Sequence, residues 1–481
     1  MSEHETVIGL EVHAQLATRG KMFCGCPTVF GAPPNSQTCP ICLGMPGVLP
    51  VINRRAVEFA VRSALALGLR VNPACRFARK HYYYPDMPKN FQISQYEEPL
   101  AEDGALEIEV SGTSRRVGIQ RLHLEEDVAK LVHEGTLETA RSSQVDFNRA
   151  GVPLMEIVSK PDLRSPDEAG AYLRKLREIV RFLKVCDGNM EEGSLRCDAN
   201  VSIRPAGSAE LGTKVEIKNL NSFRHVEQAL EYEVRRQARA LDAGERLVQE
   251  TRLWDPDGAR TVSMRSKEFA HDYRYFPEPD LPPLAISDAW LTEVRAGSPP
   301  RPEAFRAKLA ELGFTAQEAR LATPSAAMAE YVLQTVTGSA DARAAFNWIV
   351  NDVYRFIEPE DEAAVRSFAI QPRHVQGLVG LIKDGTISGK IAKDVFEAMV
   401  ETGQGAAAIV ESRGLKQVAD TGELGRVVDR ILAEHPKVVD DWKAGKKAAM
   451  GFLVGQVMKA TSGKANPAVV NALLGEKLST I

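Results

Sequence analysis

The sequence predicts an α+β fold: an N-terminal mixed domain around an antiparallel sheet, an all-α helical domain and a small all-α tail domain. Residues before about 290 mix short alternating segments with helical ones, whereas residues after about 291 are almost entirely helical in pattern. From about 406 the helical pattern continues, but lysines become concentrated toward the end. We therefore expect domains at residues 1–290, 291–405 and 406–481.

The first region contains two kinds of periodicity. Alternation of apolar and polar residues predicts strands at Thr6–Leu16, Ala105–Val110, Ala199–Ile203 and Lys214–Ile217. Apolar residues spaced three and four apart predict helices at Arg54–Leu69, Pro166–Leu183 and Phe223–Ala243. The proline-rich segment Pro277–Pro283 is stiff, and we expect it to lead out of this domain.

The two later regions are predicted to be helical throughout. Helical spacing occurs at Pro302–Leu312, Ala316–Leu321, Ser325–Thr335, Ala340–Asn351 and Gln376–Lys383. These segments carry no cluster of reactive side chains, which favours a scaffold. From Lys443 onward the chain has six lysines and one glutamate. Such lysines either form a solvated helix surface or contact a phosphate backbone, and both interpretations stay open.

Composition excludes several classes of protein. The 481 residues carry a net charge of −4, so any contact with nucleic acid must be local. The N-terminus has neither a basic start nor a long apolar run, so we expect no signal peptide and no membrane association. Seven cysteines, three of them scattered, fit a reducing cytoplasm better than a disulfide framework.

Four cysteines form the most specific motif. Cys24, Cys26, Cys39 and Cys42 follow the pattern C-x-C-x12-C-x2-C, with glycine and prolines that suit a knuckle. Two close pairs separated by a loop are what a tetrahedral zinc site requires. Such a site is usually closed and structural. Disulfides are the alternative, which the rest of the chain disfavours.

Several polar patterns point to a cleft that binds a metal and phosphate. Glu11 and His13 are two apart on a predicted strand and share a face, as Glu125 and Asp127 would if extended. A surface ion pair and a hydrated acidic turn are the alternatives.

Two further segments alternate strictly and place Asp198, Asn200, Glu216 and Lys218 in polar rows. Such rows suit a nucleotide phosphate chain with Mg²⁺, or else the wet face of a half-exposed sheet. The segment Lys80–Lys89 interleaves tyrosines with basic residues, which suits base stacking or an ordinary core edge. A P-loop, a Rossmann fingerprint and a G-x-S-x-G elbow are all missing from the sequence.

Six blocks of sequence carry a resemblance to a known family. They are Gly9–His13, Cys39–Gly47, Tyr84–Lys89, His123–Asp127, Arg196–Asn200 and Val215–Ser222. In this order they resemble the signature segments of the GatB family, the B subunits of aspartyl/glutamyl-tRNA amidotransferases. The ending from Gly451 to Pro467 resembles the family's tRNA-binding tail domain, so the resemblance extends from end to end. One departure is Val128-Ala129-Lys130, where the family more often has Ala-Gly-Lys.

The resemblance implies an ATP-dependent ligase of protein biosynthesis that acts within a heterotrimer. The GatB chain would phosphorylate the side-chain carboxylate of Glu-tRNA(Gln) or Asp-tRNA(Asn), using ATP and Mg²⁺. Ammonia from a separate amidase subunit would then displace phosphate, and a small third subunit would complete the heterotrimer. A zinc-stabilised tRNA-binding module without its own catalysis is the alternative, and a free-standing ligase for small acids is a third.

The resemblance also implies roles for individual residues. Those expected to hold Mg²⁺ are Glu11, His13, Glu125 and Glu216. Those expected at the reacting carboxylate are Glu125, Lys80, Lys89, Asp198 and Asn200. Those expected to bind ATP are Glu216, Lys218, Asn219 and Asn221. Those expected to bind tRNA are Lys446, Lys447, Lys459 and Lys464. The four cysteines would hold a structural zinc ion.

Overall fold

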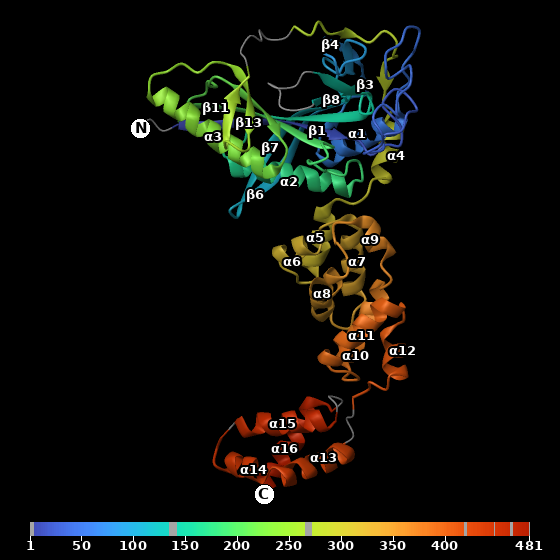
Figure 1. The fold of residues 1–481 in the computed structure, drawn as a ribbon, viewed down its shortest axis with the longest axis vertical. Helices are drawn as coiled ribbons and strands as arrows, with labels where there is room; N and C mark the ends of the chain where they lie inside the picture. The colour runs from blue at the N-terminus through green and yellow to red at the C-terminus, as the bar shows by residue number, and fades with distance from the viewer. Residues whose placement is uncertain are drawn as a thin grey trace. The chain divides into compact units, whose positions relative to one another are not determined.

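The computed structural model describes residues 4–133, 142–264, 272–417, 421–446, 448–461 and 465–480. It confirms the predicted α+β class, with a sheet-rich region followed by a helical one (Figure 1). The chain divides into two compact units, Met1–Arg301 and Pro302–Ile481, so the first unit extends beyond the predicted boundary at 290. Every helix in the described part of the chain is too short or too polar to span a bilayer.

The first unit contains sixteen described strands and four described helices. The strands are β1 His4–Gln15, β2 Arg70–Val71, β3 Ala74–Cys75, β4 Ala78–His81, β5 Phe91–Ser94, β6 Ala101–Val110, β7 Thr113–Glu126, β8 Lys130–His133, β9 Ser143–Asp146, β10 Pro153–Ser159, β11 Leu195–Pro205, β12 Val215–Leu220, β13 Glu250–Asp255, β14 Arg260–Ser263, β15 Phe276–Pro277 and β16 Leu284–Ala285. The helices are α1 Arg54–Ala66, α2 Pro166–Phe182, α3 Phe223–Asp242 and α4 Asp288–Ala296.

Nine of these strands form one sheet, in the order β14-β13-β12-β11-β1-β10-β7-β6-β2. Its pairs are antiparallel except β12 with β13, because α3 crosses between them. Small sheets are formed by β15-β4-β5, β16-β3 and β8-β9. The central strands β1, β10, β7 and β11 therefore come from distant parts of the sequence.

The two faces of the large sheet differ in chemistry. In β1, Ile8, Leu10 and Val12 are buried in the main core, together with apolar residues of α1, α2 and α3. Figure 1 shows α2 and α3 lying along this side of the sheet. Since side chains alternate along a strand, Glu11 and His13 lie on the opposite face. The helices thus leave one polar face for a site.

Helices α2 and α3 begin where the sequence provides caps. The hydroxyl of Ser165 accepts a hydrogen bond from the Glu168 amide, with proline following at the first helical position. The hydroxyl of Ser222 accepts one from the His225 amide at the start of α3. Both helices lie within one or two residues of their predicted ends.

A bulge modifies the alternation of β12. The register between β11 and β12 shifts opposite Asp198, and Asn219 adopts a left-handed backbone with φ of 66°. The extra residue lets Lys218 stay on the polar face while Leu220 turns into the core, where it is 3% exposed. A regular strand would place both residues on the same face.

The second unit is helical. Its helices are α5 Pro302–Glu311, α6 Ala316–Leu321, α7 Ala326–Thr337, α8 Ala342–Asn351, α9 Glu362–Ser367, α10 Pro372–Lys383, α11 Gly389–Thr402, α12 Ala406–Ser412, α13 Thr421–Glu434, α14 Pro436–Lys443, α15 Ala448–Ala460 and α16 Pro467–Thr480, with a 3-10 turn at Val353–Arg355. Two separate apolar cores occur, one from Leu309 to Val410 and one from Leu424 to Leu478. Helix α12 packs in the first core through Ile409 and Val410. The boundary between the two cores therefore lies after α12.

Candidate functional site

Three side chains from three adjacent strands meet on the polar face of the sheet. His13 of β1 lies opposite Glu156 of β10, and β10 in turn pairs with β7, which carries Glu125. The His13 Nε2 atom is 3.3 Å from a Glu156 oxygen and 3.9 Å from a Glu125 oxygen. One ligand atom from each residue lies within 4.8 Å of the others, so the three can hold a metal ion.

Both carboxylates are buried, and a second histidine contacts them. Glu125 is 3% exposed and Glu156 is 7% exposed. The His123 Nε2 atom is 3.3 Å from Glu156 and 3.8 Å from Glu125. The hydroxyl of Ser94 also donates to Glu125, at 3.1 Å. Buried carboxylates need such partners, because an uncompensated charge in this environment is costly.

Electrostatic coupling changes the acidity of these groups. Burial alone would lower the pKa of His123, but the charges and hydrogen bonds of Glu156 and Glu125 raise it to about 9. The pKa of His13 is likewise raised, since Glu156 and Glu125 outweigh its burial. Burial would raise the pKa of Glu156, yet the two histidines lower it well below its ordinary value. The pair of carboxylates therefore stays ionised, with its charge balanced by the two histidines.

Glu11 extends the cluster toward β11 and β12. Burial and the charges of Glu156 and Glu216 raise the pKa of Glu11, although the Asn200 amide donates to it at 2.9 Å. The other amide atom of Asn200, its Oδ1, is buried and has no hydrogen-bond partner among the described residues. An orphaned carbonyl oxygen beside a carboxylate is a free ligand for a cation or a bound water.

Lysines approach the cluster from two sides. The Lys218 ammonium lies 3.4 Å from both Asp198 and Glu216. Burial would lower the pKa of Lys80, but Glu125 and other neighbouring groups raise it. Both lysines are therefore cationic and are placed to neutralise phosphate or carboxylate oxygens.

A separate ionic layer supports the end of β7. Lys89 forms an ion pair with Glu126, whose carboxylate also accepts from the Ile93 amide at 2.9 Å. Asp127 accepts from Arg196 and from Gln15, each at 2.7 Å. These contacts fix the strand that carries Glu125.

The residues on the polar face fit a magnesium ion. Magnesium prefers oxygen ligands and is usually held by one or two carboxylates together with substrate phosphates. Glu125 and Glu156 supply such donors, and His13 adds an imidazole that suits related divalent ions. The orphaned Asn200 oxygen lies beside the neighbouring Glu11.

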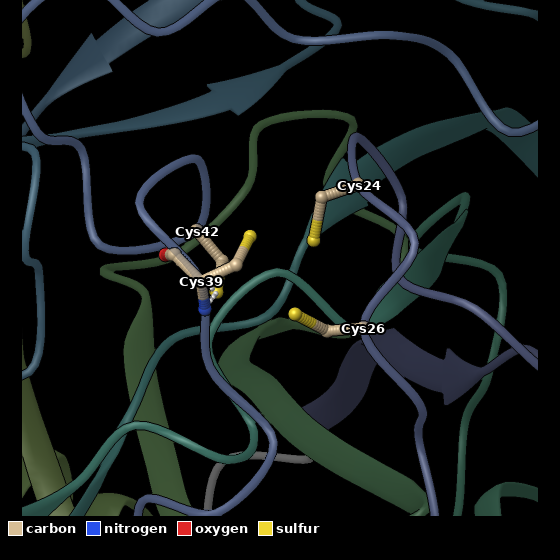
Figure 2. A group of neighbouring side chains, drawn as sticks. All are labelled: Cys24, Cys26, Cys39 and Cys42. Carbon is tan, nitrogen blue, oxygen red and sulfur yellow. Dashed lines mark hydrogen bonds between the residues drawn. The ribbon is translucent and has the colours of Figure 1, made fainter.

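The four predicted cysteines converge on one point (Figure 2). Figure 2 shows Cys24 and Cys26 on one loop, with Cys39 and Cys42 on the facing loop. One sulfur from each lies within 4.8 Å of the others, and all seven cysteines are free thiols. Zn–S bonds of about 2.3 Å put tetrahedral sulfurs about 3.8 Å apart, so the cluster can bind a metal such as zinc.

A buried lysine lies beside this cysteine site. Lys21 is 0% exposed, and its ammonium donates to the Cys42 sulfur at 3.6 Å and to the Phe147 carbonyl at 3.3 Å. The Cys39 amide also donates to Cys42, at 3.2 Å. The Cys24 hydrogen bond and Lys21 help lower the pKa of Cys42 to about 4. A cation here offsets the negative charge of a thiolate cluster.

A cavity of about 180 Å³ lies between the cysteine site and the end of β7. Lys21, Cys42, Lys89 and Glu126 line it. Gly151 has a φ of 85°, and a Cβ added to it would lie 3.4 Å from a side-chain atom of Cys42 and of Lys21. The cysteine knuckle thus borders the ion pair that supports the polar face.

Two family models and a set of relatives match this chain. The model described as the GatB/GatE catalytic domain matches residues 6–292, and the one described as the GatB domain matches residues 330–478. This chain belongs to the GatB family. It is 52% identical to the aspartyl/glutamyl-tRNA(Asn/Gln) amidotransferase B subunit of Carboxydothermus hydrogenoformans, over 100% of both chains. It is 53% identical to the protein of that name from Geobacter sulfurreducens over 99% of each chain, and 54% identical to the one from Moorella thermoacetica over 99% of this chain and 100% of that relative.

In this GatB family member most of the residues predicted to bind Mg²⁺, ATP or the reacting carboxylate lie on or beside one face. His13 and Glu125 lie together, Glu11 and Asn200 adjoin them, and Glu216 accepts a hydrogen bond from Thr251 at 2.8 Å beside Lys218. The β11–β1 register places Asp198 directly opposite Glu11.

Other predicted residues have different surroundings in this family member. Lys89 contacts Glu126 rather than the His13 cluster. The side-chain amide of Asn219 donates to the Trp254 carbonyl at 2.9 Å, and the side-chain amide of Asn221 donates to the Asn219 side-chain oxygen. In the tail, Lys446 pairs with Asp441 at 2.8 Å and Lys459 is exposed. Lys447 and Lys464 lie outside the described residues.

Sequence reasoning missed two members of the cluster. Glu156 is the one charged residue in the strand Pro153–Ser159, and a lone carboxylate in an apolar strand is the signal that could have identified it. His123 belongs to one of the six recognised blocks, but its residue type alone indicated no role. Lys21, buried at the cysteine site, was likewise not predicted to contribute.

Proposed function

We propose that this chain is the subunit of a tRNA-dependent amidotransferase that activates a side-chain carboxylate. The substrate is Glu-tRNA(Gln), Asp-tRNA(Asn) or both, and the activation uses ATP and Mg²⁺. Ammonia released by a separate amidase subunit then forms the amide, and a small third subunit completes the complex. The main support for this proposal is the buried His13–Glu125–Glu156 cluster, in a chain whose relatives are named as subunits of this amidotransferase.

The chemistry explains why such a site needs no protein nucleophile. A carboxylate is a poor electrophile, and transfer of a phosphoryl group gives it a leaving group. The reaction then needs positioning and charge neutralisation more than covalent catalysis. A polar face with carboxylates, lysines and a carboxamide supplies both.

Each side chain has a role that its position supports. His13, Glu125 and Glu156, with Glu11 beside them, would hold Mg²⁺. When bound, the ion neutralises phosphate oxygens. Lys218 adds positive charge beside Asp198, and Lys80 adds it beside Glu125. A cavity of about 230 Å³ borders Glu11 and Asn200 and reaches Lys214, which gives room for part of a nucleotide.

The cysteine site has a structural role in this proposal. Four thiolates would hold zinc, and the loop they fix borders the cavity with Lys89 and Glu126. Seven free thiols agree with a reducing cytoplasm, where the complex would act.

The proposal is tested by reconstitution with the amidase and the small third subunit. We expect ATP hydrolysis and amide formation only when misacylated tRNA is present, and no glutaminase activity from this chain alone. Substituting correctly acylated tRNA is the matched control. Amide formation without ATP, or ATP turnover on free glutamate without tRNA, would contradict the proposal. RNA binding without any ATP turnover would favour the zinc-stabilised binding module.

We also expect the tail lysines to bind tRNA. Each phosphate contact that is lost should reduce the slope of log affinity against log salt by about 0.7 to 0.9. The double variant Lys446→Glu and Lys459→Glu should therefore weaken tRNA binding and flatten this slope. The affinity is measured across salt concentrations, with Lys390→Glu on α11 as the control. An unchanged slope in the double variant would assign these lysines to solvated surface.

A further inference from the structure

Five tyrosines from three separate segments form a continuous row of rings beside the His13 cluster. This tyrosine row consists of Tyr84, Tyr82, Tyr273, Tyr275 and Tyr96, in spatial order. Consecutive ring centroids are 5.8, 6.5, 6.0 and 4.1 Å apart. The last pair, Tyr275 with Tyr96, is stacked with only 5° between the ring planes. A row assembled from segments so far apart in sequence is a feature of the tertiary fold.

The tyrosine row keeps much of its surface open to water. Tyr84 is 48% exposed, Tyr96 is 45% exposed and Tyr82 is 36% exposed. Aromatic side chains of this size normally contribute their apolar area to a core. Contiguous exposed rings of this kind are typical of interaction surfaces.

The tyrosine row is linked to the buried carboxylates through Lys80. The Lys80 ammonium lies 5.0 Å from the centre of the Tyr273 ring. The charges of Glu125 and Glu156 both act on Lys80 and on Tyr275, so these groups are neighbours. A ligand lying along the row would therefore pass the cluster at Tyr273 and Tyr275.

A second cation stands at the Tyr96 end of the row. The Arg121 guanidinium lies 6.0 Å from the centre of the Tyr96 ring. Its Nε atom is buried and has no hydrogen-bond partner among the described residues. Exposed rings combined with a guanidinium suit a planar base attached to a phosphate.

We infer that the tyrosine row is a stacking platform for the unpaired bases at the 3′ end of the aminoacylated RNA. This inference rests on the proposed function and deepens it. One adenine of ATP would cover only part of a row of five rings, whereas consecutive unpaired nucleotides can follow its length. Stacking there would deliver the esterified amino acid to the carboxylate cluster. These tyrosines are thus positioning residues.

The test uses the complete complex and measures RNA binding without ATP. We expect Tyr96→Ala and Tyr84→Ala each to weaken binding of full-length tRNA by roughly 5-fold or more. The same changes should have little effect on tRNA shortened by its terminal unpaired nucleotides. Phenylalanine at either position should restore binding, because the ring is kept. Tyr83→Ala is the matched control, since Tyr83 is 75% exposed but outside the row.

Three results would overturn the inference. Equal weakening of full-length and shortened tRNA would place the effect away from the 3′ end. A raised KM for ATP with unchanged RNA binding would assign the rings to the nucleotide base. Unchanged binding in both alanine variants would make the row structural. Because binding is measured without catalysis, a wild-type complex that binds the 3′ end but forms no amide contradicts the proposed function and leaves this inference standing.

Discussion

Replacing Glu156 by glutamine should lower the rate of amide formation by about 100-fold or more. Glutamine keeps the shape of the side chain but removes the charge that lies 3.3 Å from both His13 and His123. The site then loses one of its two central carboxylates and with it much of its attraction for a divalent ion. The rate is measured with the reconstituted complex at saturating ATP and misacylated tRNA.

The control for this experiment is Glu107→Gln on β6, an exposed glutamate on the same sheet. Glu107→Gln should leave the rate unchanged. A second comparison uses Glu125→Gln and the double variant. Residues that hold one ion act as a unit, so the double variant should be little slower than either single one. Full activity in Glu156→Gln, with a normal melting temperature, would refute the role of the cluster.

Replacing Cys42 by serine should release zinc and destabilise the first unit. Cys42 is the most buried of the four site cysteines, and its sulfur accepts from Lys21 and Cys39. Loss of a structural metal removes binding energy that holds the loop folded. We expect stoichiometric zinc in the wild type, less than half in the variant, and a melting temperature lower by roughly 5 °C or more. Elemental analysis and thermal unfolding measure the two effects.

Cys75→Ala provides the matched control for zinc retention, because Cys75 is buried but lies outside the cluster. Its zinc content should equal that of the wild type. A wild-type protein that is purified without chelators, contains no zinc and has four freely titrating thiols would contradict the metal assignment.

Local sequence patterns predicted those parts of the site that depend on nearby residues. Period-two spacing was enough to predict that Glu11 and His13 share a face, and the cysteine spacing was enough to predict that four sulfurs lie together. Helices α2 and α3 were predicted nearly to the residue because apolar spacing is a local feature of the sequence. Such features require no knowledge of which strands become neighbours.

The rest of the site depends on strand order. His13 meets Glu125 only because β10 lies between β1 and β7, and β10 also carries Glu156. A single glutamate in an apolar strand resembles a core position when its neighbours are unknown. The bulge at Asn219 likewise depends on pairing with β11. Nothing in the local pattern could reveal these long-range contacts.

The most direct test of the polar face as a metal and nucleotide site is crystallographic. Crystals of the complex are soaked with Mn²⁺ and a non-hydrolysable ATP analogue, and the ion is located by its anomalous signal. We predict an ion coordinated by His13, Glu125 and Glu156, with the phosphates on the same face as Lys218. A fully occupied ion and nucleotide on another surface, with these three side chains unliganded, would contradict the account.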